Sequence, residues 1–186
     1  MSYDFFAPSS VYGSLDSKNL QYPLTLYLVA GTQAEKKNQN AIYVMKWDEL
    51  CKTKNDDDSI DFDSDDSKDD GEPEMHLLTI RQNSCINRIK TMNNSPIVAY
   101  WNEDCEVGLI NTSEYLETLI AYEEDPATGK RPPLKAPKGN GLIRTYKHPT
   151  EGFALEWSPH NNGWYYFLYA LANNFQQRHF CFRKQR

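Results

Sequence analysis

The chain has few residues of the kinds that build catalytic and metal sites, and it lacks the motifs that arrange them. Its four cysteines lie far apart without a Cys-x-x-Cys pair, so they predict neither a zinc site nor a disulfide framework. Glycine-rich phosphate loops, nucleophile elbows and His-Glu-x-x-His motifs are missing. We therefore expect a protein that is not an enzyme, with no catalytic residue, no metal and no cofactor.

Long apolar runs are also missing. No stretch approaches the roughly 18 apolar residues of a membrane span. The first ten residues, MSYDFFAPSS, have neither the basic start nor the apolar centre of a signal peptide. We expect a soluble protein that is not secreted, has no membrane partner, and keeps its thiols reduced in the cytosol or nucleus.

What the chain does have is a strongly uneven distribution of charge. The net charge is −6, but residues 56–74 hold 11 of the 26 acids and a single base, Lys68, so this segment carries −10 and the remainder +4. Blocks of like charge repel one another, and the segment has too little apolar surface to offset the entropy of ordering. The sequence predicts an acidic, disordered loop between two strands.

We interpret this loop as a binding element, because a flexible polyanion attracts basic proteins over a long range and masks their charge. The alternative is a solubilising loop without a partner. Ser67, with two aspartates shortly after it, is a candidate phosphorylation site for an acid-directed kinase. The residues predicted to contact a partner are Asp56, Asp57, Asp58, Asp61, Asp63, Asp65, Asp66, Asp69, Asp70, Glu72 and Glu74.

Outside the acidic loop, apolar residues alternate as they do in β-strands. The pattern predicts strands at 23–30, 41–47 and 75–80, the first two forming an antiparallel pair. Residues 1–22 lack clear periodicity and are predicted to form a flexible arm. Short strands at 85–92, 97–101 and 106–110, separated by Asn, Asp and Ser turns, have the spacing of an all-β meander.

A helix and a further strand are expected after this meander. The helix is predicted to begin at Asn111 with Glu114 completing a capping box, and to end at Pro126. Its apolar stripe would be Tyr115, Leu116, Leu119 and Ile120. A loop rich in Pro, Gly and Lys follows, and its prolines favour a solvated loop over a nucleic-acid contact. Residues 142–146 would then return as the outer strand of the same sheet.

Residues 148–159, HPTEGFALEWSP, have the pattern of the innermost strand of a propeller blade. Phe153, Leu155 and Trp157 alternate with smaller or polar residues, and His148 is expected to be a turn histidine bonded within its own blade. Residues 164–186 break the pattern, with 8 of the 24 aromatics followed by RKQR. We expect this tail to lie outside the fold; the alternative is a C-terminal helix.

Several of these segments resemble, in order, those of the glutamate-rich WD-repeat proteins. The resemblance rests on PLTLYLVAGTQAE (23–35), the acidic insert, INRIK (86–90), PIVAYWNEDCEVGLIN (96–111) and HPTEGFALEWSP (148–159), and it spans about residues 22–163. A looser resemblance is to the histone-binding WD-repeat subunits of chromatin assembly factors. Proteins of the closer family are seven-bladed β-propellers. Because each blade needs about 40 residues, we expect this chain to form a mostly β, incomplete propeller of about two blades with one inserted helix.

The implied organisation has five parts. They are a flexible arm (1–22), N-terminal propeller strands (23–55), the acidic loop (56–74), a first blade with the helix and the start of a second blade (75–163), and a divergent aromatic and basic tail (164–186).

The resemblance also implies a function. It suggests a nuclear and nucleolar chaperone that binds basic proteins, namely a large-subunit ribosomal protein or histones, during ribosome biogenesis, with pre-ribosomal particles as further partners. One alternative is a chromatin-associated histone-binding scaffold or ubiquitin-ligase adaptor. Another is a truncated fragment without independent function, because about two blades cannot close a ring.

Overall fold

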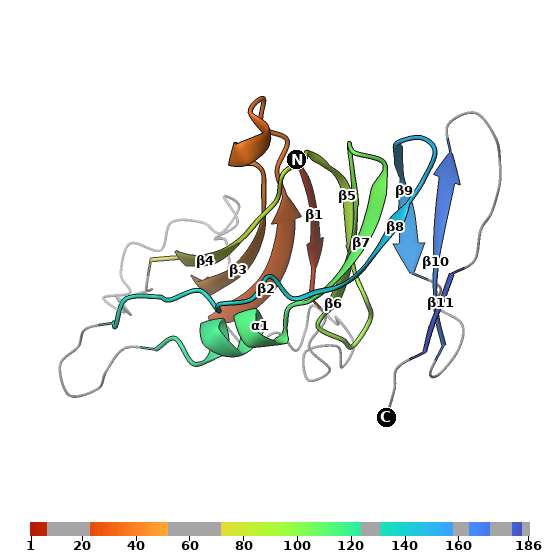
Figure 1. Ribbon diagram of the computed structural model, residues 1–186. Helices are drawn as coiled ribbons and strands as arrows, with labels where there is room; N and C mark the ends of the chain where they lie inside the picture. Colours follow the sequence, from red (N-terminus) through yellow and green to blue (C-terminus); the bar gives the residue numbers. More distant parts are fainter. Residues whose placement is uncertain (7–22, 52–71, 124–130, 158–163, 172–179, 184–186) are drawn as a thin grey trace, which may run out of the picture.

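The computed structural model contains three antiparallel β-sheets and one α-helix within its described residues (Figure 1). No helix among them is long and apolar enough to cross a membrane. The structure describes residues 1–6, 23–51, 72–123, 131–157, 164–171 and 180–183.

The three sheets follow one another along the chain. The first consists of β1 (Ser2–Phe5), β2 (Leu24–Gly31), β3 (Ala41–Leu50) and β4 (Glu74–Arg81), with the short 3-10 helix η1 (Lys37–Gln39) between β2 and β3. The second consists of β5 (Ile86–Thr91), β6 (Ile97–Asn102), β7 (Glu106–Asn111) and β8 (Leu142–Lys147), with α1 (Ser113–Ile120) before β8. The third consists of β9 (Gly152–Trp157), β10 (Trp164–Leu171) and β11 (Phe180–Arg183).

The strand order identifies the architecture. Each sheet is a simple meander in chain order, and the first strands of the three sheets lie against one another, β1 against β5 and β5 against β9. Meander sheets stacked through their first strands are the arrangement of β-propeller blades. The described part of the chain is therefore a partial WD-type propeller without a closed ring, which confirms the predicted mostly β fold class.

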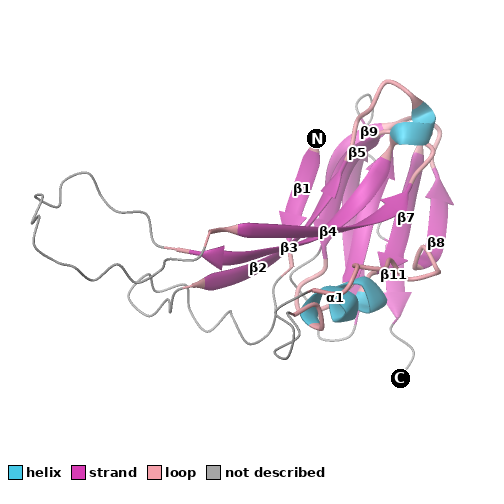
Figure 2. Cartoon of the chain, turned by 90° about the vertical axis from the view of Figure 1, so that its left-hand side faces the viewer, coloured by secondary structure: helices cyan, strands magenta, loops and turns pink. Residues whose placement is uncertain are grey.

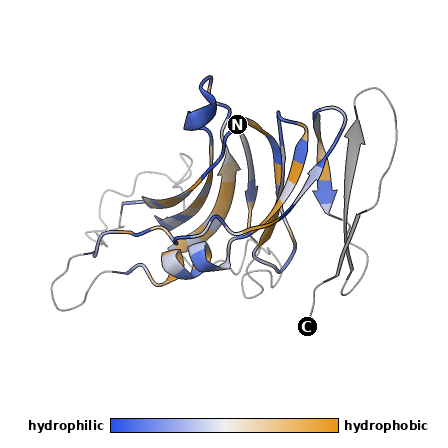
Figure 3. Ribbon diagram, viewed as in Figure 1, coloured by the Kyte–Doolittle hydropathy of each residue, from blue (hydrophilic) through white to orange (hydrophobic). Residues whose placement is uncertain are grey.

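Apolar residues on alternating strand positions fill the two layers between the sheets. The turn that contains η1 is hydrophilic (Figure 3). The layer between the first and second sheets contains Val29, Ile42, Val44, Leu78, Ile80, Ile86, Ile89, Val98, Tyr100 and Ile110. The layer between the second and third sheets contains Met92, Ala99, Trp101, Val107, Leu109, Leu155 and Trp157.

The first residues form a strand, so the prediction of a flexible arm is wrong for this part. β1 pairs with β2 from Ser2 opposite Gly31 to Phe5 opposite Leu28. On its other side, the Asp4 carboxylate accepts hydrogen bonds from the backbone N–H of Thr91, at 2.9 Å, and from its hydroxyl, at 3.1 Å. A four-residue strand is too short to show alternation in the sequence. Residues 7–22 of the predicted arm lie outside the described residues.

The helix begins two residues later than predicted and without the expected capping box. Thr112 occupies the N-cap position, but its hydroxyl donates to the backbone carbonyl of Pro96, at 2.7 Å, instead of capping the helix. Asn111 accepts hydrogen bonds from the N–H and hydroxyl of Ser113, at 3.0 and 2.7 Å, which makes a turn before the helix. The Thr112 hydroxyl therefore binds the β5–β6 connection at Pro96, and it does not cap the backbone N–H groups of the helix.

The apolar stripe of α1 is narrower than the sequence suggested. Tyr115 and Leu119 are buried beneath the first and second sheets, and Leu116 packs beside them. Ile120 is 55% exposed and is the last residue of the helix, which ends well before Pro126.

The described parts of the predicted tail belong to the third sheet. β10 pairs antiparallel with β9, and β11 pairs antiparallel with β10. The expectation that this region lies outside the fold is therefore wrong for 164–171 and 180–183, as is the alternative of a helix there. The segment lacks blade motifs, but its many aromatic residues favour strands.

One residue of the blade motif departs from the expected alternation. The register of β9 with β10 passes from Ala154 opposite Ala170 to Gly152 opposite Leu171, which leaves Phe153 without a partner in a bulge. Phe153 is consequently 58% exposed, whereas Leu155 and Trp157 are buried.

Candidate interaction surface at the root of the acidic segment

Most of the predicted partner-binding acids, from Asp56 to Asp70, and the candidate phosphorylation site Ser67 lie outside the described residues. Their roles stay predictions. Glu72 is described and exposed. Glu74 is the first residue of β4, so the predicted boundary of the disordered loop at 74 is wrong. The pairing of Glu74 with Asp48 of β3 orders it.

The acidic segment leaves and re-enters the first sheet on neighbouring strands. β3 and β4 are paired along their whole shared length, up to Asp48 opposite Glu74. Figure 2 shows β2, β3 and β4 running together to this end of the sheet. The strand pairing therefore brings the two roots of the segment close together on one end of the sheet.

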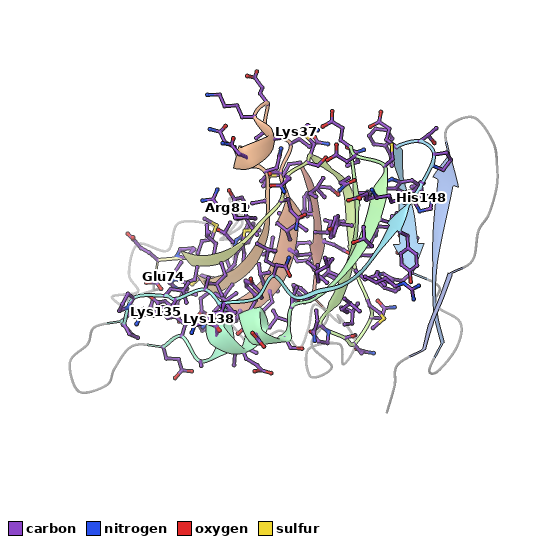
Figure 4. The ribbon with its side chains drawn as sticks, viewed as in Figure 1. Lys37, Glu74, Arg81, Lys135, Lys138 and His148 are labelled. Atoms are coloured by element: carbon purple, nitrogen blue, oxygen red, sulfur yellow. The ribbon has the colours of Figure 1, made fainter. Side chains whose placement is uncertain are left out.

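A cluster of ionic residues holds the β4 root. The carboxylate of Glu74 accepts a hydrogen bond from the guanidinium of Arg131, which comes from the loop before β8. The Nε2 atom of His76 lies 3.2 Å from Glu74 Oε2 and 3.1 Å from Arg131 Nη1. The hydrogen bond from Arg131 holds the pKa of Glu74 below its usual range, although burial opposes this. Figure 4 marks Glu74 at this end of the sheet.

A second ion pair holds the β3 root. Lys46 Nζ lies 2.7 Å from Asp48 Oδ2, and the side chain of Lys46 is only 9% exposed. The hydroxyl of Thr25 also donates to Asp48. Burial alone would raise the pKa of Asp48, but the hydrogen bonds from Lys46 and Thr25, together with the lysine charge, lower it on balance.

We call Lys46, Asp48, Glu74, His76 and Arg131 the root cluster. Its side chains come from neighbouring strands and one loop, and each cation faces a carboxylate of the sheet. The cluster can therefore anchor the segment, because it satisfies its own charges. The sequence did not predict this cluster, although Glu74 was among the predicted partner-binding acids, since Arg131 and Glu74 are 57 residues apart and no local pattern links them.

A shallow cavity of about 320 Å³ lies between the end of α1 and the following loop, and its lining is mainly apolar. Across residues 1–6, 23–51, 72–123 and 131–157, no three His, Cys, Asp or Glu side chains converge to hold a metal. The cavity is lined by Thr118, Ala121, Tyr122, Pro132, Pro133, Leu134 and Lys135.

The blade motif has a structural position. The backbone N–H of His148 donates to the carbonyl of Cys105, at 2.8 Å, within the second sheet. Its ring packs at 5.2 Å from that of Trp101. Trp157 closes β9 and reaches the carbonyl of Lys90 in β5. The contacts of His148 thus lie within the second sheet, and the contact of Trp157 joins the third sheet to the second.

Comparison with known proteins finds relatives of one kind. Glutamate-rich WD repeat-containing protein 1 of Dictyostelium discoideum is 38% identical over 158 residues, covering 78% of this chain and 30% of the relative. HEAT STRESS TOLERANT DWD 1 of Arabidopsis thaliana is 35% identical over 162 residues, covering 77% and 34%. Ribosome assembly protein rrb1 of Schizosaccharomyces pombe is 26% identical over 166 residues, covering 86% and 32%. No family model and no solved structure matches the chain.

The stacked meander sheets and these similarities together define a WD-repeat protein of the β-propeller class. Within that class, the chain belongs to the family of glutamate-rich WD-repeat and ribosome-assembly proteins. This confirms the resemblance inferred from the sequence segments. The chain spans about a third of the length of the curated relatives it matches.

Proposed function

We propose that the chain is a non-enzymatic binding module for basic proteins in ribosome biogenesis, acting in the nucleus and nucleolus. The observation that carries the proposal is the insertion of a segment of charge −10 between two paired strands of a propeller sheet. One relative is named a ribosome assembly protein, which supports the process. The proposed cargo is a basic large-subunit ribosomal protein or a histone.

The mechanism is electrostatic capture. A dense run of carboxylates raises the rate at which a cationic protein meets the module and lowers the effective charge of the bound cargo. Exposed charges are screened over about 8 Å at physiological ionic strength, so capture must weaken as salt is added. The captured cargo would then dock on the sheets beside the segment.

The root cluster gives the two ends of the segment different tasks. Glu74 is bound by Arg131 and serves as an anchor, so we assign capture to the acids from Asp56 to Glu72. Because β3 and β4 are paired at the roots, the captured cargo stays near one end of the first sheet. The root cluster therefore positions the segment and leaves its charge for the cargo.

The test is a comparison of three chains of equal length. In the first variant, every Asp and Glu from residue 56 to 72 becomes Asn or Gln; in the second, the same residues are kept in shuffled order. Binding to a purified large-subunit ribosomal protein and to histones is measured by fluorescence anisotropy at low and high salt. We expect the neutral variant to bind at least about tenfold more weakly, and the shuffled one to bind normally.

The shuffled variant separates charge from sequence, since electrostatic capture depends on the density of carboxylates and not on their order. The proposal fails if the neutral variant binds basic cargo as tightly as the wild type, or if added salt leaves wild-type binding unchanged. A comparison of the two cargoes shows which basic protein the module prefers.

A further inference from the structure

The cavity between the end of α1 and the following loop has no role in the proposed capture of cargo. Its volume is about 320 Å³, and of its seven lining residues only Lys135 is charged. All seven come from the connection between β7 and β8, so the packing of another sheet face does not explain the cavity. A mainly apolar hollow with one charged group in its lining is typical of a binding site for an apolar anchor.

The cavity adjoins the root cluster on both of its walls. On the helix side, the ring of Tyr122 has its centre 5.0 Å from that of His76 in β4. On the loop side, Arg131 comes directly before the lining prolines and donates to the carboxylate of Glu74. Figure 4 places Lys135 and Glu74 at the same end of the molecule. The cavity therefore lies next to the point where the acidic segment re-enters the first sheet.

The acidic segment contains one pair of large apolar side chains. They are Ile60 and Phe62, and every other neighbour within two residues of them is Asp or Ser. Residues two apart in an extended chain point to the same side, so both side chains can enter one cavity together. Burial there would remove from water the only large apolar groups between residues 56 and 74.

The chain on each side of this pair is long enough to reach the cavity. Ile60 is nine residues beyond Cys51, the last described residue before the segment. Glu72, the first described residue after it, is ten beyond Phe62. An extended chain covers about 3.3–3.6 Å per residue, so each arm spans up to about 30–36 Å. The cavity adjoins the root at Glu74 and lies within this reach.

Charge also favours this occupant. Lys135, in the lining, and Lys138, three residues later, are exposed and positive, and no acid is among the lining residues. Asp61 and Asp63 alternate with the apolar pair and carry the opposite charge. Residues 124–130, which connect the two walls, have no large apolar side chain that could fill the cavity.

We propose that the cavity is a docking site for the chain's own acidic segment, with Ile60 and Phe62 as its apolar anchor. The anchor packs against Tyr122 and Leu134, and the aspartates beside it face Lys135. A tethered anchor meets its site at an effective concentration on the order of millimolar, so a small apolar contact is sufficient. The docking rests on the cavity and the roots of the segment, and it stands whether or not the segment captures basic cargo.

The test is photo-crosslinking in the full chain. Phe62 is replaced by p-benzoylphenylalanine, which keeps an aromatic ring and bonds on irradiation to C–H groups in contact with it. Mass spectrometry of the digest should locate the crosslinks in residues 118–122 or 132–135. The same replacement at Ser67 is the control, because Ser67 shares the tether but has only charged neighbours. It should crosslink there at least about fivefold less.

Two further substitutions in the chain that carries the photo-crosslinker at position 62 test the cavity itself. Ala121→Glu adds an acid to the lining and should reduce the crosslinks at least about fivefold. Ile120→Glu is the matched control, because it adds the same charge at the next position, which is 55% exposed and outside the lining. It should leave the crosslinks unchanged. Far-UV circular dichroism verifies that each variant is folded.

The proposal is overturned if position 67 crosslinks to the cavity as often as position 62, if Ala121→Glu leaves the crosslinks unchanged, or if no crosslink forms. A product of twice 21.6 kDa would identify a second copy as the occupant and would also overturn it. No cargo is present in this experiment. Its failure is therefore distinct from failure of the binding test with basic proteins.

Discussion

The indole Nε1 of Trp157 donates a hydrogen bond to the backbone carbonyl of Lys90, at 3.0 Å. The two residues belong to consecutive sheets, Trp157 at the end of β9 and Lys90 in β5. Beside this bond, Lys90 Nζ lies 3.0 Å from the carboxylate of Glu156. The third sheet is thus attached to the second by this part-buried hydrogen bond, by the ion pair, and by a hydrogen bond from the Asn87 amide to the carbonyl of Gly152, at 3.5 Å.

Replacement of Trp157 by Phe should destabilise this junction. The aromatic ring is kept in part, but the carbonyl of Lys90 loses its donor, and a lost hydrogen bond of this kind costs about 1 kcal/mol. The smaller ring also leaves space beside Leu155. Urea unfolding measures the difference. Phe153→Ala, an exposed change on the same strand, should change stability by less than about 0.5 kcal/mol; equal losses in both variants would contradict the expectation.

Gly152 should not tolerate a side chain. A Cβ atom at this position would lie 2.3 Å from the indole of Trp101, which is fully buried and cannot move away. Overpacking of this kind costs about 1–3 kcal/mol, so we expect Gly152→Ala to lower the melting temperature clearly. Gly139→Ala is the control, since a Cβ atom there would lie 3.9 Å from its nearest neighbour, the backbone nitrogen of Gly141. A neutral Gly152→Ala would show that the third sheet can shift.

Asn40 organises the turn between β2 and β3. It is fully buried, its Oδ1 accepts a hydrogen bond from the N–H of Ala34 at 2.7 Å, and its amide donates to the carbonyl of Ala34 at 3.3 Å. Asn40→Ala removes the acceptor of the Ala34 N–H and leaves the Ala34 carbonyl to the thiol of Cys85, at 3.5 Å, which costs about 1–3 kcal/mol. Denaturant unfolding should show this loss. The neighbouring Gln39→Ala, at an exposed position, should leave stability nearly unchanged. Similar losses of stability in both variants would argue against a stabilising role for the Asn40 hydrogen bonds.

Acid should weaken the root cluster through Glu74. Because the hydrogen bond from Arg131 lowers its pKa in the folded chain, Glu74 stabilises the fold fully above its ordinary value of 4.5. That contribution to stability is lost as the pH falls through the lowered pKa of Glu74 in the folded chain. The side chain is 38% exposed, so the effect is small, about 0.2–1 kcal/mol.

Unfolding of wild type and Glu74→Gln at about pH 7 and pH 3.5 tests this expectation. The variant should be less stable at the higher pH and should lose less on acidification. Glu35→Gln removes one charge at an exposed position and controls for net charge. If Glu74→Gln and the wild type lose the same stability in acid, Arg131 does not stabilise the carboxylate.

The strands that could be predicted are those whose two faces differ in burial. On β3, Ile42 and Val44 face the second sheet while Tyr43 and Met45 face outward, and this difference produces a clear alternation. The bulge at Phe153 could not be predicted, because the sequence of β9 alternates regularly. The extra residue depends on the pairing of β9 with β10.

The features that sequence did not reveal depend on contacts between distant segments. Thr112 bonds to Pro96 instead of capping the helix, and Arg131 reaches Glu74 from a proline-rich loop. Neither partner is near in sequence, so local propensity cannot report the contact. The acidic segment could be recognised in the sequence, because its density of acidic residues alone distinguishes it from the rest of the chain.

The position of β1 has a consequence for synthesis of the chain. Its Asp4 carboxylate binds the backbone of Thr91, which is made 87 residues later. At about 5–20 residues per second, a newly made β1 waits on the order of ten seconds before its partner strand in the second sheet exists. During that interval β1 can pair with β2 but lacks its contact with the second sheet, so the first sheet forms before the contact that joins it to the second.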